Sequence, residues 1–393
     1  MGDDAGPMLR PQMPLPDADA MDASRALTAL VESGIAARGG WMPFADYMQL
    51  ALYAPGLGYY TGGAAKFGPA GDFVTAPSLG PLFAQTLARQ VAALLRASAP
   101  SILEFGAGGG ELAGVLLAEL ARLGCPVEQY AILEPGPELR ERQRATLARL
   151  APGHAAKVTW LDGLPAQFRG VMIANEVVDA MPVHAVAWRE EGIFERGVMI
   201  ADGKLAWSER PASGELLAVA GTLGIQPPYA SEVALAARGW MRSVAGSLEL
   251  GALLVIDYGF PAPEFYHPQR STGTLMCHYR HFAHADPFLY PGLQDITAHV
   301  DFSALAAAAR TASLDVPGYA TQSNFLVNCG ITEVLERYDP ADAMRFAPQA
   351  SAAQKLLSPA EMGELFKVLC VARGLSGAQC LMGFARGERS HTL

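Results

Sequence analysis

The sequence predicts an α/β fold built on a mostly parallel, open β-sheet. Between residues 101 and 176, short apolar runs alternate with amphipathic stretches of helical length. Each apolar run ends in a glycine or a polar residue, as a strand of a parallel sheet does where the chain turns into a loop. The amphipathic stretches supply the crossover helices that parallel strands require.

Composition narrows the functional classes. The chain has 393 residues, 51% hydrophobic and 17% charged, which is enough for a large core and a sizeable second part. A net charge of −10 disfavours a nucleic-acid-binding surface. No apolar run reaches the roughly 18–20 residues of a membrane span. The five cysteines are widely spaced without a C-x-x-C pair, which predicts neither a zinc site nor a disulfide framework.

The N-terminal quarter divides into a tail and a helical segment. Residues 1–23 hold five aspartates and four prolines and no apolar signal region, so we expect a disordered tail and a cytoplasmic protein. Residues 24–98 form an N-terminal helical segment, with helices expected at 24–38, 43–53 and 82–95. The loop holding Asp72, Phe73 and Thr75 is interpreted as a lid over a ligand, with Phe73 or Tyr60 shielding the ligand from water, or else as packing for the helices.

The sheet-forming domain is expected to occupy residues 99–184 and 249–393. Its predicted strands are 102–105, 129–133, 158–161, 170–174, 251–258 and, at the end of the chain, 384–386. Its predicted helices are 111–123, 137–150, 302–312, 332–338 and 360–372. Residues 185–248 are predicted to be an inserted mixed α/β subdomain, with antiparallel strands 186–189, 193–198 and 204–207 and a helix over 232–248.

A glycine-rich loop follows the first predicted strand. It begins at Glu104 and continues through Gly106, Ala107, Gly108 and Gly110. Glycines let the backbone turn tightly and let a ligand approach it without a Cβ in the way. In an open parallel sheet this loop lies at the carboxyl ends of the strands, where ligands bind. An ordinary glycine-rich turn would look similar, so the loop alone identifies no ligand.

Two acidic residues favour a ligand with a cationic amino-acid end. Where a dinucleotide fingerprint has its third glycine, this chain has Glu111. Glu104 and Glu111 would repel a pyrophosphate, which disfavours a nicotinamide-dependent oxidoreductase. The oxidoreductase alternative is not excluded by Glu134, at the end of the next strand, because this residue alone would also fit a nicotinamide cofactor.

Polar residues end the three following strands as well. Glu134 is expected to accept both hydroxyls of a ribose, and Asp162 with Gly163 to lie within reach of an adenine amino group. Asn175 and Glu176 are expected beside the reactive centre of the ligand. One strand-end carboxylate is commonly just solvated, but four in register predict a site for a nucleoside-containing, cationic cofactor.

At this point the chain resembles the MidA-type methyltransferases, relatives of the mitochondrial complex I assembly factor that methylates an arginine. The resemblance covers roughly residues 24–390. It rests on motifs in residues 47–60, 71–78, 104–110, 175–183, 256–259, 273–280 and 294–302.

The resemblance implies a class I (Rossmann-like) methyltransferase fold with a seven-stranded, mostly parallel sheet. It implies S-adenosylmethionine as cofactor, with Thr75 among the binding residues, and a protein acceptor, an arginine of a respiratory complex I subunit. A homodimer is left open. The runner-up is a non-catalytic assembly or binding factor that keeps the cofactor fold, but such a scaffold has no need of an intact glycine loop or of Asn175-Glu176.

Glu176 and Asp179 are predicted to be the catalytic pair. A guanidinium keeps its proton to a pKa above about 12, so carboxylates that orient it and stabilise developing charge suit the reaction. Residues three apart share one face of a helical turn, which would place these two carboxylates side by side. The alternative is that Asp179 only caps the turn that follows it.

A second polar group gathers late in the chain. Its members are Tyr279, His281, Asp295, His299 and Asp301. Their spacing matches no recognised metal site, so no metal is predicted, and structural hydrogen bonding or a substrate groove is expected.

Overall fold

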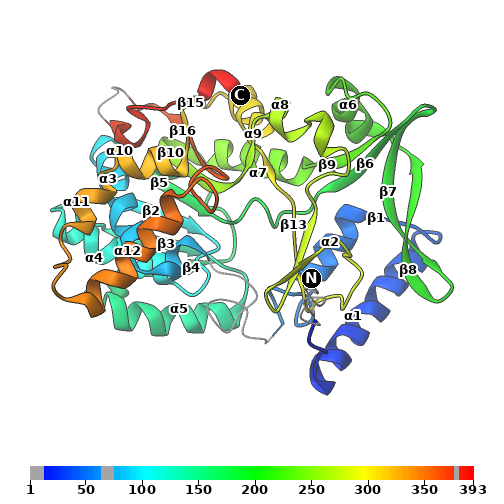
Figure 1. Ribbon diagram of the computed structural model, residues 1–393, viewed down its shortest axis with the longest axis horizontal. Coiled ribbons are helices and arrows are strands. Elements are labelled where there is room, and N and C mark those ends of the chain that lie inside the picture. The colour runs from blue at the N-terminus through cyan, green and yellow to red at the C-terminus, as the bar shows by residue number, and fades with distance from the viewer. Residues whose placement is uncertain (1–12, 63–74, 376–379) are drawn as a thin grey trace, which may run out of the picture.

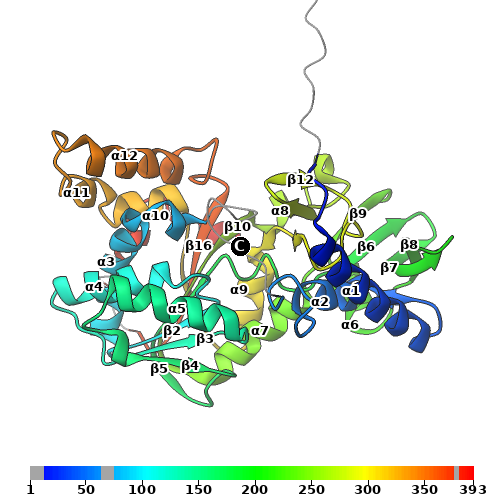
Figure 2. The same cartoon turned by 90° about the horizontal axis from the view of Figure 1, so that it is seen from below.

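The computed structural model describes residues 13–62, 75–375 and 380–393. Figures 1 and 2 show two lobes: a large one around the main β-sheet, and a smaller one in which the N-terminal helices pack against a second sheet. Within the described residues, no helix has both the length and the apolarity needed to cross a bilayer.

The main sheet is mostly parallel, as predicted. Its strands follow the order β15-β16-β10-β5-β2-β3-β4, and the two-residue β14 joins at the end of β10, making eight strands among the described residues. β16 runs antiparallel to both of its neighbours, β10 and β15, and the other pairings in this sheet are parallel. The bounds are β2 Ser101–Phe105, β3 Gln129–Leu133, β4 Val158–Leu161, β5 Phe168–Asn175, β10 Leu248–Phe260, β14 Val300–Asp301, β15 Asp315–Thr321 and β16 Phe366–Arg373.

Helices cover both faces of this sheet because successive strand residues point to opposite sides. On β10, Leu254 packs with the cluster that includes helices α3 and α4, whereas Leu253 packs with the cluster of helices α7 and α9. The bounds are α3 Pro81–Ala97, α4 Glu111–Arg122, α5 Pro137–Leu150, α7 Leu235–Ser247 and α9 Phe302–Thr311.

The smaller lobe combines the insertion with the start of the chain. Its sheet has the order β1-β7-β6-β9, with β8 paired to β7, and all of these pairings are antiparallel. The strand bounds are β1 Met42–Pro43, β6 His184–Arg189, β7 Gly192–Ala201, β8 Lys204–Pro211 and β9 Tyr229–Val233. The helices are α1 Ala18–Ala37, α2 Phe44–Tyr53 and α6 Gly214–Thr222.

Two further pieces complete the chain. A small antiparallel sheet, β12-β11-β13, joins the core of the smaller lobe through Cys277 and Ile296. Its strands are β11 Met276–Tyr279, β12 Phe282–His284 and β13 Asp295–Thr297, preceded by the short α8 Ala262–Phe265. Helices α10 Gln322–Asn328, α11 Ile331–Leu335 and α12 Ala343–Leu357 form a block against α3.

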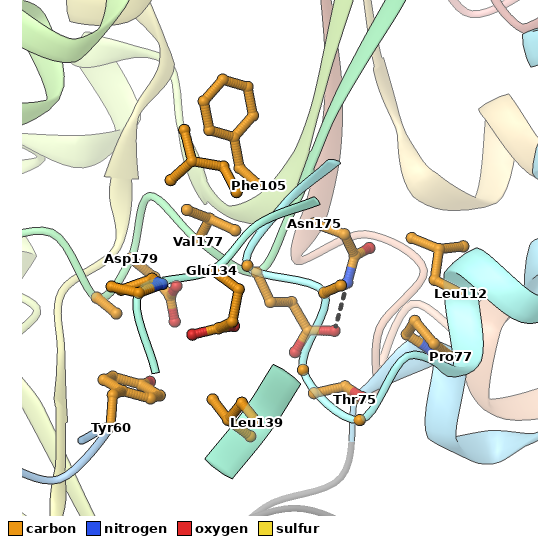
Figure 3. Close-up of a pocket in the computed structure, with 18 of the residues that line it drawn as sticks. Tyr60, Thr75, Pro77, Phe105, Leu112, Glu134, Leu139, Asn175, Val177 and Asp179 are labelled. Carbon is orange, nitrogen blue, oxygen red and sulfur yellow. Dashed lines mark hydrogen bonds between the residues drawn. The ribbon is translucent and has the colours of Figure 1, made fainter. Parts of the chain in front are cut away.

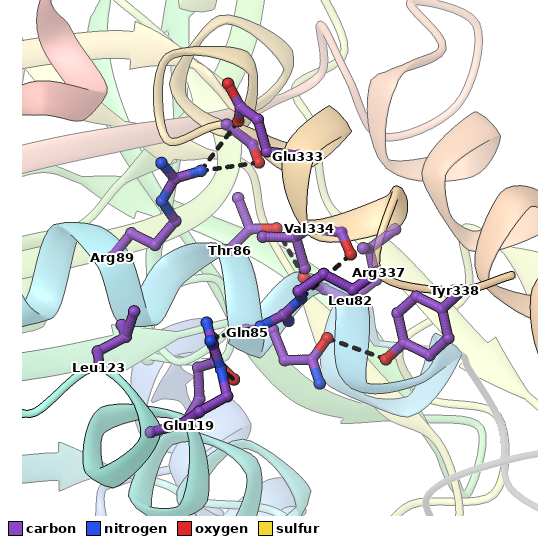
Figure 4. Close-up of polar contacts among 12 residues, drawn as sticks. Leu82, Gln85, Thr86, Arg89, Glu119, Leu123, Glu333, Val334, Arg337 and Tyr338 are labelled. Carbon is purple, nitrogen blue, oxygen red and sulfur yellow. Dashed lines mark hydrogen bonds and ion pairs between the residues drawn. The ribbon is translucent and has the colours of Figure 1, made fainter.

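Polar contacts fasten that helical block to the main domain. Arg337, just after α11, approaches Glu119 of α4 at 2.9 Å, and the Glu119 side chain is only 5% exposed. Arg89 of α3 pairs with Glu333 at 2.9 Å, and Tyr338 donates to Gln85 at 3.0 Å (Figure 4). The block is therefore docked through ionic contacts as well as through its apolar face.

Three sequence predictions about elements are wrong. Residues predicted as a helix over 360–372 contain β16, whose apolar residues are buried on both faces between β10 and β15. The predicted strand at 384–386 is instead a 3-10 turn at Met382–Phe384. The helix predicted to start at 232 starts at 235, since residues up to Val233 pair as β9 with β6.

Two predicted boundaries also change. Helix α1 begins at Ala18, six residues before position 24, because the Asp17 carboxylate caps it by accepting from the Ala20 N–H at 2.9 Å. Residues 1–12 of the predicted tail lie outside the described residues. The sequence prediction assigned helix α7 to the insertion, but α7 packs on the main sheet with α9. Judged by its packing, the insertion therefore ends near Val233.

Candidate active site

A cavity of about 380 Å³ opens at the carboxyl ends of β2, β3 and β5. Its walls come from both lobes: the glycine loop after β2 and the strand ends from one, and Tyr53 and Tyr60 from the other. Figure 3 shows the side chains of Glu134, Asn175 and Asp179 around this space. This is the edge of an open parallel sheet where ligands are expected.

The glycine loop forms one wall, and its conformation requires glycine. Gly106, Gly108 and Gly110 have φ values of 59°, 51° and 89°. A Cβ on Gly110 would lie 3.1 Å from the Cα of Gln143, in helix α5. Gly106, Ala107 and Gly108 all line the cavity, so bare backbone faces whatever binds there.

Glu134, at the end of β3, is buried and lines the cavity. Its carboxylate accepts from the Gly136 N–H at 2.9 Å and from the Gln143 amide at 3.2 Å. Burial raises its pKa, whereas these donors lower it. Gln143 also donates to the Gly108 carbonyl at 3.0 Å, so a single amide ties the glycine loop to Glu134.

Three predicted ligand contacts are placed elsewhere. Glu104 is 2% exposed, and its carboxylate accepts from the Tyr130 hydroxyl at 2.6 Å. Burial raises its pKa to about 7. Asp162, its side chain 92% exposed, pairs with Arg140 at 2.6 Å. Glu104, Asp162 and Gly163 are absent from the cavity lining in the described part of the chain.

Glu176 follows β5 and reaches into the cavity. One carboxylate oxygen accepts from the Ala76 N–H at 3.1 Å and from the Asn175 side chain at 3.2 Å. Burial, together with the nearby Asp179 charge, raises the pKa of Glu176 to about 8. Its φ of 53° is rare for a residue with a side chain, and such backbone strain gathers at functional sites.

Asp179 lies in a single turn, closed by the Met181 N–H donating to the Val178 carbonyl at 3.1 Å, and no helix forms there. The buried Asp257 carboxylate at the end of β10 accepts from the N–H groups of Val177, Val178 and Asp179 at 2.9–3.2 Å. Asp179 in turn accepts from the Tyr258 hydroxyl at 2.7 Å, while its other oxygen is buried without a hydrogen-bond partner. Glu176 and Asp179 nevertheless both line the cavity.

Comparisons with known proteins agree with this geometry. Residues 84–320 match the family model described as "Putative S-adenosyl-L-methionine-dependent methyltransferase". A crystal structure from Burkholderia thailandensis bound to S-adenosyl-homocysteine is 54% identical, with a TM-score of 0.94, and the match covers 97% of this chain and all of that one.

More distant relatives share most of the chain. "Protein arginine methyltransferase NDUFAF7, mitochondrial" of Danio rerio is 29% identical over 84% of this chain and 83% of its own length. The Homo sapiens protein of that name is 28% identical over 83% of this chain and 79% of its own.

This chain belongs to the MidA-type family of S-adenosylmethionine-dependent methyltransferases.

The cavity of this methyltransferase suits its cofactor, S-adenosylmethionine. The amide oxygen of Asn175 is buried without a hydrogen-bond partner, as expected of an acceptor for the ammonium of the cofactor. Glu134 offers a carboxylate for ribose hydroxyls, and the glycine loop offers open backbone. Thr75 lines the cavity as well, whereas Asp72 and Phe73 of the predicted lid lie outside the described residues.

The late polar group does not form one site in the methyltransferase. Asp301 caps helix α9 by accepting from the Ala304 N–H at 2.9 Å. Asp295 accepts from the Tyr60 hydroxyl at 2.9 Å, beside the cavity. The His299 ring lies edge-on to Tyr258, with ring centroids 5.2 Å apart, and burial lowers its pKa to about 4. Structural hydrogen bonding, one of the two predicted roles, therefore describes Asp301, while Asp295 lies near the site.

Sequence reasoning missed several residues of the site. Asp257 and Tyr258 stand at a predicted strand end, and that position was the available signal for them. No sequence feature identifies Gln143 as a site residue, because a glutamine inside an amphipathic helix resembles any surface residue. Tyr53 comes from the other lobe, and only the three-dimensional fold brings it to the cavity, whereas Tyr60, one of the two residues considered for shielding the ligand, does line it.

Proposed function

We propose that this methyltransferase transfers a methyl group to an arginine of a protein partner. The observation that carries the proposal is the pair of carboxylates, Glu176 and Asp179, that face one acidic cavity beside the glycine loop. A cavity of this charge suits a cationic acceptor. The printed names of the relatives, protein arginine methyltransferases, support the same class of acceptor.

In this proposal the protein positions the acceptor and takes up its proton. The bound cofactor supplies the methyl group. Asp257 fixes the loop of Asp179, and the N–H of Ala76 helps to orient Glu176. The two carboxylates then hold the guanidinium by charge-assisted hydrogen bonds. When a nitrogen–carbon bond forms, one N–H proton leaves, and an ionised carboxylate of the pair accepts it.

The finer assignments belong to the same proposal. The path of seven strands with β16 antiparallel supports a class I methyltransferase fold, the short β14 being an addition. The sequence resemblance supports a respiratory complex I subunit as the acceptor.

The test is Glu176→Gln, assayed for transfer of labelled methyl to an extract from a strain lacking the protein. We expect transfer to be abolished and affinity for S-adenosylhomocysteine to change little. Asp162→Asn is the matched control, because Asp162 is a strand-end carboxylate outside the cavity lining. Full transfer by Glu176→Gln would overturn the role of the pair.

The acceptor itself is found by mass spectrometry. Comparison of the proteomes with and without this protein should reveal one lost methyl-arginine. A lost methyl group on a residue other than arginine would refute the arginine assignment while leaving methyl transfer intact.

A further inference from the structure

Two stacked tyrosines form one wall of the cavity. Tyr53 is the last residue of α2, and Tyr60 lies in the loop after it. Their rings are stacked, with centroids 5.5 Å apart and planes inclined by 22°. Both line the cavity, and Figure 3 shows Tyr60 on the Asp179 side of the space.

These two tyrosines differ from their neighbours in the chain. Tyr47 and Tyr59 are 0% and 2% exposed and belong to the apolar core of the smaller lobe. Tyr53 and Tyr60 are only partly buried, and they reach the cavity from that core. Packing of the N-terminal helices is therefore the role of the first pair, and the second pair has surface left for a ligand.

The hydroxyl groups of the wall donate to protein atoms. The Tyr53 hydroxyl donates to the Ala180 carbonyl at 3.0 Å, and the Tyr60 hydroxyl donates to Asp295 at 2.9 Å. Burial and neighbouring carboxylates raise the pKa of both phenols, so both stay neutral. The hydroxyls fix the orientation of the rings, and the rings supply the ligand-facing surface.

The charge around the wall is negative. Asp295, Asp179 and Glu134 all act on the Tyr53 hydroxyl electrostatically. Among the described residues, four carboxylates line the cavity: Glu111, Glu134, Glu176 and Asp179. The basic residue of the lining is Arg142, which lies 3.5 Å from Glu138. A cofactor carrying one sulfonium leaves this excess of negative charge partly uncompensated, which favours a second, cationic ligand.

We propose that Tyr53, Tyr60 and Asp179 form the acceptor subsite and select a planar guanidinium over an ammonium or a neutral side chain. The inference rests on the proposed function and adds the residues that determine its specificity. A guanidinium stacks on an aromatic face, is weakly hydrated, and presents a fork of N–H donors to a carboxylate. The unpartnered Asp179 oxygen accepts from that fork. An ammonium is more strongly hydrated and cannot stack, so it gains less.

The test measures ligand binding to the full chain saturated with S-adenosylhomocysteine. The probes are the amides of N-acetyl-arginine, N-acetyl-lysine and N-acetyl-citrulline, the last a neutral analogue of arginine. Saturation-transfer NMR should show that the arginine amide binds at least fivefold more tightly than either of the others. Equal binding of the three, or binding of none, would overturn the subsite.

Matched variants assign the selectivity to the wall. Tyr53→Leu and Tyr60→Leu should reduce the preference for arginine to less than twofold, whereas Tyr53→Phe and Tyr60→Phe, which keep the rings, should retain most of it. Affinity for S-adenosylhomocysteine is measured for every variant to verify folding. A preference unchanged in both folded Leu variants would refute the wall. Persistent arginine methylation in those variants would refute only the role of the two tyrosines. Full transfer by Glu176→Gln would instead refute the catalytic role proposed for Glu176 and Asp179.

Discussion

At the scale of single residues, carboxylates at similar sequence positions have different environments. Glu104 and Glu134 both lie at ends of neighbouring parallel strands, yet Glu104 points to Tyr130 and Glu134 points to the cavity. The register explains the difference, because Glu104 pairs with Ile132 inside the sheet, whereas Glu134 lies two residues further on, beyond the end of β3. Position at a strand end therefore indicates proximity to the ligand, but not contact with it.

The pair Glu104→Gln and Glu134→Gln tests this difference. Glu104→Gln can still accept from Tyr130, so affinity for S-adenosylhomocysteine should change less than threefold. Glu134→Gln loses a charged acceptor that faces the cavity, and such hydrogen bonds contribute about 1.5–3 kcal/mol, or about tenfold or more in affinity. Isothermal titration calorimetry measures both, and equal losses would contradict the placement of Glu104.

The raised pKa of Glu176 predicts a pH dependence of cofactor binding. With a pKa of about 8 the free protein holds this proton at neutral pH, and a cationic cofactor favours the ionised form. Affinity for S-adenosylmethionine should therefore rise about tenfold between pH 7 and pH 9. S-adenosylhomocysteine, which lacks the sulfonium charge, should show a smaller rise, and Glu176→Gln should abolish the difference. If the affinities for the two ligands rose equally with pH in the native protein, this role of Glu176 would be contradicted.

Much of the site is predictable at this scale because its signals are local. The glycine loop, Glu134, Asn175 and Glu176 each follow an apolar strand in the sequence, and all line the cavity. Asp162 also follows an apolar strand, but it does not line the cavity, and its exposed carboxylate pairs with Arg140 at 2.6 Å. The pairing partner is on a different element, which periodicity along one segment does not reveal.

At the scale of elements, tertiary burial decides between helix and strand. Residues 360–372 were predicted as a helix because a short apolar run carries no reliable period. β16 pairs on both edges with β10 and β15, so all its apolar residues are buried whichever way they point. By contrast, β3 and β4 and helix α5 were predicted with the observed bounds, because turn residues mark both ends.

The ionic contact between α4 and the helical block gives a stability prediction. Arg337→Ala removes one charged partner of the buried Glu119, leaving Arg122. We expect the free energy of unfolding to fall by about 1–2 kcal/mol in urea denaturation. Arg345→Ala is the control, since its pair with Asp342 is exposed and should contribute less than about 0.5 kcal/mol. Equal losses in the free energy of unfolding for the two variants would show that the buried ion pair contributes no more than the exposed one.

At the scale of the whole molecule, the cavity belongs to both lobes. Tyr53 and Tyr60 come from the smaller lobe, and the glycine loop and Glu176 come from the larger. The sequence predicted an N-terminal helical segment and an insertion as separate parts, but it could not show that β1 joins the sheet of the insertion or that α2 leads into the cavity. The contact between β1 and β7 joins segments more than 100 residues apart, and local patterns do not encode it.

A ligand shared by two lobes should stabilise both. Hydrogen exchange with S-adenosylhomocysteine should slow in residues 44–62 as well as in residues 101–111. At a ligand concentration of about 100 times Kd, the stabilisation is about 2.7 kcal/mol, which raises Tm. NAD, tested in parallel, should leave both Tm and exchange unchanged. Protection confined to residues 101–111 would mean that the smaller lobe does not contribute to the bound state.

The antiparallel strand β16 has a consequence for how the protein is made. It separates β10 from β15 and is the last strand of the described chain to be synthesised. When β10 emerges from the ribosome, one of its edges therefore lacks a partner for about 100 further residues. An apolar strand with an open edge is a template for pairing with other chains. Completion of the central sheet must await the synthesis of β16, and nascent chains are most in need of chaperone protection during that interval.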